Sequence, residues 1–193
     1  SGTLMANTAP LVQLWAGHGP RHIIVSNDNK FVYVLTEMTG IVITLALDRK
    51  TGLLTAVSEA SVLPPGSTLR PGAPRGAAAQ GGPPRDTAND IWASDLHLTP
   101  DGRFLYAAER TTSTLATFSV DAATGTLTFL SSTPVEKQPR GFRIHPNGKF
   151  LVVSGERSET ISVYAIQPNG GLTLLRTYPT GTGSTWVEIV SFE

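Results

Sequence analysis

The chain has 193 residues, of which 40% are hydrophobic and 16% are charged, and its 15 basic and 15 acidic side chains give a formal net charge of zero. The apolar content is sufficient for a sizeable core, and the balanced charge argues against a nucleic-acid partner, which requires a basic face. The absence of cysteine excludes disulfide scaffolds, thiolate metal sites and cysteine nucleophiles. No apolar run resembles a membrane span, so we expect no membrane association and a cytoplasmic location.

Three segments of the chain share one pattern, in which a polar turn is followed by an aromatic residue and an apolar run. The aromatic residues Phe31, Phe104 and Phe150 are separated by 73 and 46 residues. A second motif ends in glycine, and its copies are separated by the same two intervals: Gly52, Gly125 and Gly171. Two independent motifs with one spacing indicate a true internal repeat.

The longer interval contains 27 additional residues, which a segment rich in proline and glycine accounts for. From Pro64 to Pro84 the chain has six prolines and five glycines among 21 positions. We predict that residues 64–90 form an inserted loop within a single partial propeller domain, residues 1–193. The three arginines of this loop are expected to face solvent rather than a ligand: Arg70, Arg75 and Arg85.

Each repeat is expected to form four short antiparallel strands joined by tight turns. In the second repeat the first strand ends at the turn Asp101-Gly102, and the next strands cover residues 104–108, 114–120 and 127–131. A repeat of about 46 residues with four antiparallel strands is typical of a β-propeller blade. The sequence therefore predicts an all-β fold built from such blades.

The chain length predicts about three and a half blades. Ala9–Ala16 is predicted to be the last strand of a preceding blade, and Trp186–Val190 the first strand of a following one. An open arc of blades leaves sheet edges and apolar faces bare. We therefore expect part of a seven-bladed ring, completed by a second copy of the chain or by a missing N-terminal half.

The series of motifs along the chain resembles the lactonase family, a family of seven-bladed propellers that includes bacterial 6-phosphogluconolactonase and fungal carboxymuconate cyclase. The motifs are Gly19-Pro-Arg-His22, Trp92 to Tyr106, Glu109-Arg-Thr111, Gln138-Pro-Arg-Gly-Phe142 and Ile161-Ser-Val-Tyr164. The resemblance extends from about Ala9 to the C-terminus, except for the inserted loop. It corresponds to the C-terminal half of such proteins.

Strand order divides the loops between the two ends of the sheets. The first-to-second and third-to-fourth turns share one face, where turn geometry explains the residue types and His145 is expected to be a turn or surface histidine. On the other face, Glu37, Arg110 and Glu156 occupy one repeat position, again 73 and 46 residues apart. We predict a polar-ligand site there, and salt bridges between blades are the alternative. The blade-to-blade loops contribute the other candidates: His18, Arg21, His22, Trp92, Asp95, Gln138, Arg140 and Trp186.

The residue types on this face fit a small anionic substrate, because arginine binds carboxylate or phosphate through paired hydrogen bonds. Glu37 or His22 could move a proton during lactone hydrolysis or formation. Arg110 or Arg140 could stabilise the developing oxyanion. Glu37, His22 and Arg110 are predicted to be catalytic, and the other candidates to bind substrate. The family resemblance implies site roles for Arg21, Glu37 and Arg110, and it places a further histidine in a preceding blade that the chain lacks.

Other chemistries have weaker support in the sequence. Asp95 and His97 can point the same way on one strand, but no third ligand stands at metal-like spacing, so we predict neither a metal nor a cofactor. Ser94 lacks the Gly-x-Ser-x-Gly context of a serine hydrolase. Trp92 and Trp186 precede first strands and are predicted to pack between blades near the axis.

We therefore predict a lactonase-type propeller that hydrolyses or forms a small anionic lactone, such as a phosphorylated sugar lactone or carboxymuconolactone. The alternative is a non-catalytic propeller arc that acts as an interaction scaffold, because a fold by itself does not establish an activity.

Overall fold

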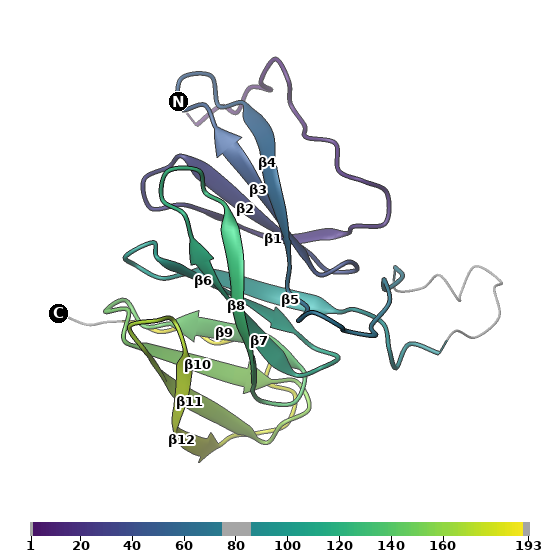
Figure 1. Cartoon of the computed structure of the whole chain (residues 1–193), viewed down its shortest axis with the longest axis vertical. Helices are drawn as coiled ribbons and strands as arrows, with labels where there is room; N and C mark the ends of the chain where they lie inside the picture. The colour runs from purple at the N-terminus through teal and green to yellow at the C-terminus, as the bar shows by residue number, and fades with distance from the viewer. Residues whose placement is uncertain (1, 75–85, 191–193) are drawn as a thin grey trace.

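The structure is a computed structural model that describes residues 2–74 and 86–190. The described residues form twelve strands and no helix, and the strands are arranged in three separate four-stranded antiparallel sheets. Figure 1 shows the three sheets one above another, with the first sheet along the chain at the top and the third at the bottom. The predicted all-β fold of propeller blades is therefore confirmed. Within the described part of the chain, no helix is present that could cross a bilayer.

Each sheet contains four strands in chain order. Blade 1 consists of β1 (Pro20–Val25), β2 (Phe31–Thr36), β3 (Ile41–Leu47) and β4 (Leu54–Ser61). Blade 2 consists of β5 (Ala93–Leu98), β6 (Phe104–Glu109), β7 (Thr114–Val120) and β8 (Leu127–Pro134). Blade 3 consists of β9 (Pro139–Ile144), β10 (Phe150–Gly155), β11 (Thr160–Ile166) and β12 (Leu172–Pro179). The first strands β1, β5 and β9 are the inner strands, and neighbouring ones contact each other across the blade boundaries.

The polar turn between the first two strands has the same geometry in all three blades. The residue that opens the turn donates its backbone N–H to the carbonyl of the aromatic residue five positions later, at 2.8–2.9 Å. The turn also requires one residue with a left-handed backbone, which is Asn29 (φ 55°), Gly102 (φ 72°) or Gly148 (φ 71°). Glycine and asparagine adopt this conformation at the lowest cost, which explains the Asn-Gly and Asp-Gly patterns of the sequence.

The two repeated motifs contact each other across the blade boundaries. A Cβ on Gly125 would lie 2.5 Å from the Phe31 ring, and one on Gly170 would lie 2.5 Å from the Phe104 ring. The aromatic residue of one blade thus packs on the glycine turn of the next blade, which explains why both motifs keep one spacing. Phe31 and Phe104 are 8% and 6% exposed, whereas Phe150 is 36% exposed because no further blade follows within the described residues.

The third glycine turn differs from the prediction by one residue. The turns of blades 1 and 2 have left-handed glycines at Gly52 and Gly125, but in blade 3 the left-handed glycine is Gly170 rather than Gly171. The reason is that the connection from β11 to β12 is one residue shorter than its two counterparts.

Two apolar cores fill the spaces between neighbouring sheets. Between blades 1 and 2, Tyr33 and Leu35 of β2 pack with residues of blade 2 such as Phe118. Between blades 2 and 3, Tyr106 of β6 packs with residues of blade 3 such as Phe142. Because each of these side chains is almost fully buried, the cores fix the position of one blade relative to the next.

The two end segments predicted as strands are not strands. Ala9–Ala16 and Trp186–Val190 have no paired neighbour among the described residues, and a strand needs one to bond its N–H and C=O groups. The C-terminal segment lies beside β9 but does not pair with it as a strand. The contact that shows this proximity is the ion pair of Glu188 with Arg143 of β9 (Nη2–Oε1 3.1 Å). Trp186 is 62% exposed, so its predicted packing between blades is wrong.

Two residues of the loop between β4 and β5 are bonded to each other across the loop. Arg70 and Asp90 form an isolated parallel bridge, and the Arg70 Nε lies 3.0 Å from the Asp90 Oδ1. The Arg70 side chain is half exposed, but its guanidinium pairs with protein groups. Arg75 and Arg85 belong to residues 75–85, which lie outside the described residues.

Candidate functional site

Glu37, Arg110 and Glu156 take one structural position in three successive blades. Each is the first residue after the second strand of its blade. Its backbone N–H donates to the carbonyl of the residue just before the first strand of the same blade, at 2.8–3.1 Å. This shared bond brings the three residues to one end of the sheets, as the repeat predicts.

Each inner strand has a register shift at the same place in the repeat. The residues passed over by the regular pairing are Arg21 on β1, Ser94 and Asp95 on β5, and Arg140 on β9. A β-bulge interrupts the alternation of a strand and redirects its side chains. The bulges therefore place the charged residues of the inner strands near the rim formed by the second-to-third loops.

Arg21, Glu37 and Arg110 form an ionic cluster that links blades 1 and 2. The Arg110 Nη2 donates a hydrogen bond to the Glu37 Oε1, and the Arg21 Nε lies 3.8 Å from the Glu37 Oε2. The Arg110 Nε also donates to the Trp92 carbonyl at 3.1 Å, and the Arg21 Nη1 donates to the Ser94 carbonyl. The Arg110 side chain is only 5% exposed, so its charge is held in a fixed position.

The electrostatic balance of this end of the sheets favours an anion. Burial lowers the pKa of Arg21; Glu37 counteracts this lowering, whereas the nearby charges of Arg110 and Arg140 add to it. Arg140 is paired with Glu156 (Nη1–Oε2 3.5 Å). The guanidinium groups of Arg21, Arg110 and Arg140 thus lie near one another, with Glu37, Glu156 and Asp95 as the neighbouring carboxylates, and an anionic ligand would relieve the repulsion among the three arginines.

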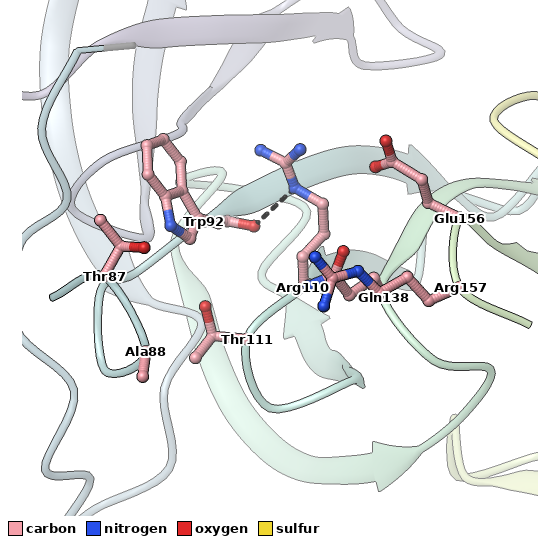
Figure 2. A pocket seen from close by; sticks show the side chains of 8 residues that line it. All are labelled: Thr87, Ala88, Trp92, Arg110, Thr111, Gln138, Glu156 and Arg157. Carbon is pink, nitrogen blue, oxygen red and sulfur yellow. Dashed lines mark hydrogen bonds between the residues drawn. The ribbon is translucent and has the colours of Figure 1, made fainter. Parts of the chain in front are cut away.

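A pocket of about 450 Å³ lies at the same end of blades 2 and 3. Its lining residues are Thr87, Ala88, Trp92, Arg110, Thr111, Gln138, Glu156 and Arg157. In Figure 2 the Arg110 side chain stands between Trp92 and Glu156, and its Nε bonds the Trp92 carbonyl. The size is typical of a site for a small molecule.

Four of these lining residues were not among the sequence candidates. Thr111 and Arg157 directly follow the rim positions 110 and 156, so extending the repeat position by one residue would have identified them. Thr87 and Ala88 lie in the inserted loop, which has no counterpart in the other repeats. The described end of this loop therefore borders the pocket, while its residues 86–89 are exposed to solvent as expected of an inserted loop.

Asp95 lies between two histidines on the inner strands. Its Oδ1 accepts a hydrogen bond from the His22 Nδ1 at 2.8 Å, and its Oδ2 accepts bonds from the His97 Nε2 and the Phe142 N–H, each at 3.2 Å. Burial by itself would raise the pKa of Asp95, but the hydrogen bonds from His22 and His97 outweigh it and hold the pKa well below its usual range. Asp95 is 2% exposed, so protein groups surround it and the predicted direct contact with a substrate does not fit this position.

Seven of the eleven sequence candidates lie outside the pocket lining: Arg21, His22, Glu37, Arg140, Asp95, His18 and Trp186. Arg21, Glu37 and Arg140 belong to the ion pairs beside the pocket, and His22 is bonded to Asp95. The His18 Nδ1 is 3.1 Å from the Thr39 Oγ1, in a contact within blade 1. Trp186 is on the exposed C-terminal segment. Neither residue lines the pocket at the end of blades 2 and 3.

A family model described as "Lactonase, 7-bladed beta-propeller" matches residues 1–189. The chain therefore belongs to the lactonase family of seven-bladed β-propellers, which confirms the resemblance of its motifs.

Relatives in the family extend well beyond this chain in length. It is 36% identical over 191 residues to a 6-phosphogluconolactonase of Serratia proteamaculans, covering 98% of the chain and 52% of that protein. It is 33% identical over 193 residues to a 6-phosphogluconolactonase of Cronobacter sakazakii, covering 100% and 52%. The chain thus spans about half the length of the curated relatives it matches.

Solved structures show the same relationship. The periplasmic gluconolactonase of Pseudomonas aeruginosa superimposes with a TM-score of 0.74 and 30% identity, over 90% of this chain and 43% of that chain. A Bacteroides fragilis protein superimposes with a TM-score of 0.80 and 26% identity, over 99% and 47%.

Proposed function

We propose that this protein hydrolyses a sugar lactone that carries a negative charge, with a phosphorylated gluconolactone as the preferred substrate. The observation that carries this proposal is the cluster of Arg21, Glu37 and Arg110 beside a pocket of suitable size. The names of the Serratia proteamaculans and Pseudomonas aeruginosa relatives, a 6-phosphogluconolactonase and a gluconolactonase, support a sugar lactone as the substrate class.

Substrate binding would use the positive charge of this end of the sheets. A guanidinium group bonds two oxygens of a phosphate or carboxylate at once, which fixes the orientation of the ligand. Arg110 borders the pocket with little freedom to move, because Glu37 and the Trp92 carbonyl hold its guanidinium. Arg157 borders the same pocket and adds a second positive charge.

Hydrolysis needs a water molecule to attack the lactone carbonyl. The carbonyl oxygen becomes negative in the tetrahedral intermediate, and Arg110 or Arg140 would stabilise that charge. A proton must leave the attacking water and reach the ring oxygen as its bond to the carbonyl carbon breaks. Glu37 and His22 are the two candidates for this proton transfer.

Three other expectations stay predictions. The relatives named above give no support for carboxymuconolactone as the substrate. A non-catalytic scaffold role stays a second candidate, because the chain spans only about half of its relatives. The expected cytoplasmic location is also a prediction, since one structural relative is named as a periplasmic protein.

Completion of the ring belongs to the same proposal. Phe150 is exposed, whereas its counterparts Phe31 and Phe104 are covered by the glycine turn of the next blade. A further blade, from a second copy or from the other half of a longer protein, would cover Phe150 in the same way. Light scattering of the purified chain tests the second-copy version, which predicts a mass above 20.5 kDa. A stable monomer would contradict it.

The activity test compares lactone hydrolysis by the wild type with that of one matched pair of variants. We expect Arg110→Gln to lower the rate above the spontaneous background by about 10²- to 10³-fold, because one stabilising donor is removed. Arg49→Gln, on an exposed turn at the opposite end of blade 1, is expected to keep the wild-type rate. A background rate for the wild type with 6-phosphogluconolactone and with gluconolactone would contradict the proposed function.

A further inference from the structure

His22 and Asp95 form a pair in which a buried carboxylate orients an imidazole. A carboxylate can only accept a hydrogen bond, so the 2.8 Å contact requires the proton of a neutral His22 to be on Nδ1. The Nε2 of the same ring then carries a lone pair and can accept a proton. Within the described residues no hydrogen bond to this Nε2 is present, and the His22 side chain is 29% exposed.

The position of Asp95 makes this orientation rigid. Besides His22 on β1, the Asp95 carboxylate bonds His97 on β5 and the Phe142 N–H on β9, so one side chain joins the inner strands of three blades. A histidine whose one nitrogen is held by a carboxylate and whose other nitrogen is free has the arrangement of a general base.

Glu37 is less suited to take a proton from water. One of its oxygens accepts a hydrogen bond from Arg110, and the other is within ion-pair distance of Arg21. Both carboxylate oxygens of Glu37 thus face guanidinium groups of neighbouring arginines. Glu37 is therefore placed to hold the two arginines in position rather than to move a proton.

We infer that His22, oriented by Asp95, is the group that transfers the proton in this site, and that Glu37 acts as the counter-ion of the arginines. The inference rests on the proposed lactone hydrolysis. His22 directly follows Arg21 on the bulged segment of β1, and Arg21 bonds the carbonyl of Ser94, the neighbour of Asp95. The pair and the arginine cluster are thus parts of one connected structure.

The reaction step balances with these groups alone. The Nε2 of His22 takes a proton from water while the water oxygen bonds to the lactone carbonyl carbon and the carbonyl electrons move to the carbonyl oxygen. When the intermediate collapses, the bond from this carbon to the ring oxygen breaks, and His22 gives its proton to the ring oxygen. The product is a hydroxy acid, and His22 is neutral again.

Charged and titratable groups on every neighbouring element bear on the pH dependence of this step. Asp95 and His97 lie on β5, and Arg21 precedes His22 on β1. Glu37, Arg110 and Arg140 lie at the rim around Arg21. Because a general base must be unprotonated to accept a proton, the rate is expected to fall toward acidic pH.

The first experiment is an NMR measurement of the ring nitrogens, which does not depend on activity. The chain has four histidines, so ¹⁵N-labelled rings can be assigned with single His→Gln variants. We expect His22 to be the Nδ1–H tautomer in the wild type and to lose this preference in Asp95→Asn. Addition of 6-phosphogluconate, the product of the proposed reaction, should shift the His22 Nε2 resonance. An Nε2–H tautomer of His22 would overturn the inference. It would also be overturned if 6-phosphogluconate shifted the NMR resonances of residues at the rim and left those of His22 unchanged.

The second experiment compares rates of lactone hydrolysis across pH. We expect His22→Gln to lower kcat by about 10²- to 10⁴-fold and to remove the acidic fall in rate. Glu37→Gln should mainly raise KM and keep the acidic fall. The control is His145→Gln, a turn histidine at the opposite end of the sheets, which should behave as the wild type.

The outcomes separate this inference from the proposed function. An active wild type whose kcat is unchanged in His22→Gln, or whose acidic fall disappears in Glu37→Gln instead, overturns the role of His22 and leaves lactone hydrolysis standing. A wild type that neither hydrolyses lactones nor shows shifts with 6-phosphogluconate overturns both.

Discussion

Substitution of Glu109 by glutamine tests how the rim of the pocket is held. Glu109 is fully buried at the end of β6. One carboxylate oxygen accepts the Trp92 N–H at 2.8 Å, and the other accepts the N–H and the hydroxyl of Thr112 at 2.6 and 2.7 Å. These three bonds fix the segments on both sides of Arg110, so they link the stability of the blade to the geometry of the site.

The expected loss of stability follows from the number of hydrogen-bond acceptor oxygens in the side chain. Glutamine keeps the shape of Glu109 but has one acceptor oxygen, so its NH₂ group must face a backbone N–H in either orientation. At least one hydrogen bond to a charged acceptor is then lost, and such bonds contribute about 1.5–3 kcal/mol. We expect the free energy of unfolding to fall by that amount, which corresponds to a decrease in Tm of about 3–12 °C for a domain of this size.

Urea unfolding followed by tryptophan fluorescence measures this loss. The matched control is Glu59→Gln, because Glu59 is exposed on β4 and its substitution should change the stability by less than about 0.5 kcal/mol. Equal stability of the two variants would refute the reasoning, since it would show that the three bonds of Glu109 contribute no more than an exposed carboxylate does.

Three further predictions concern individual contacts. Gly125→Ala should destabilise the protein by about 1–3 kcal/mol more than Gly66→Ala, because both have a left-handed backbone but only Gly125 faces an aromatic ring; equal losses in thermal unfolding would contradict this. Asp95 has a lowered pKa in the folded state, so its stabilisation is complete above the unfolded pKa of about 4 and is lost as pH falls toward the folded value. Urea midpoints of Asp95→Asn should therefore fall less steeply in acid than those of the wild type, and parallel curves would exclude this role. Tyr106→Phe removes a 2.7 Å bond to a turn carbonyl and should cost about 1 kcal/mol, whereas Tyr33→Phe, at a hydroxyl with no partner among the described residues, should be nearly neutral in the same measurement.

Much of the candidate site could be predicted because it follows the repeat. The positions of Glu37, Arg110 and Glu156 at one end of three blades follow from their intervals of 73 and 46 residues. The repeat also predicts which loops share a face, since antiparallel strands alternate in direction. It could not predict that Asp95 is buried behind His22, because that depends on how β1, β5 and β9 approach one another.

The errors arose where a segment lacks a neighbour or a counterpart. Ala9–Ala16 and Trp186–Val190 have strand-like sequences, but a strand forms only where another strand accepts its backbone bonds. Thr87 and Ala88 reach the pocket from the inserted loop, for which the repeat offers no template.

The amino-acid sequence by itself determined the three four-stranded blades, because turn residues and alternating apolar positions act locally and recur at fixed intervals. Only the tertiary structure decided which side chains meet between the blades. The ion pair of Glu37 with Arg110 and the pair of His22 with Asp95 each join residues 73 positions apart, on different blades. Their geometry depends on the packing of whole sheets and on the bulges of the inner strands, and no local pattern encodes either.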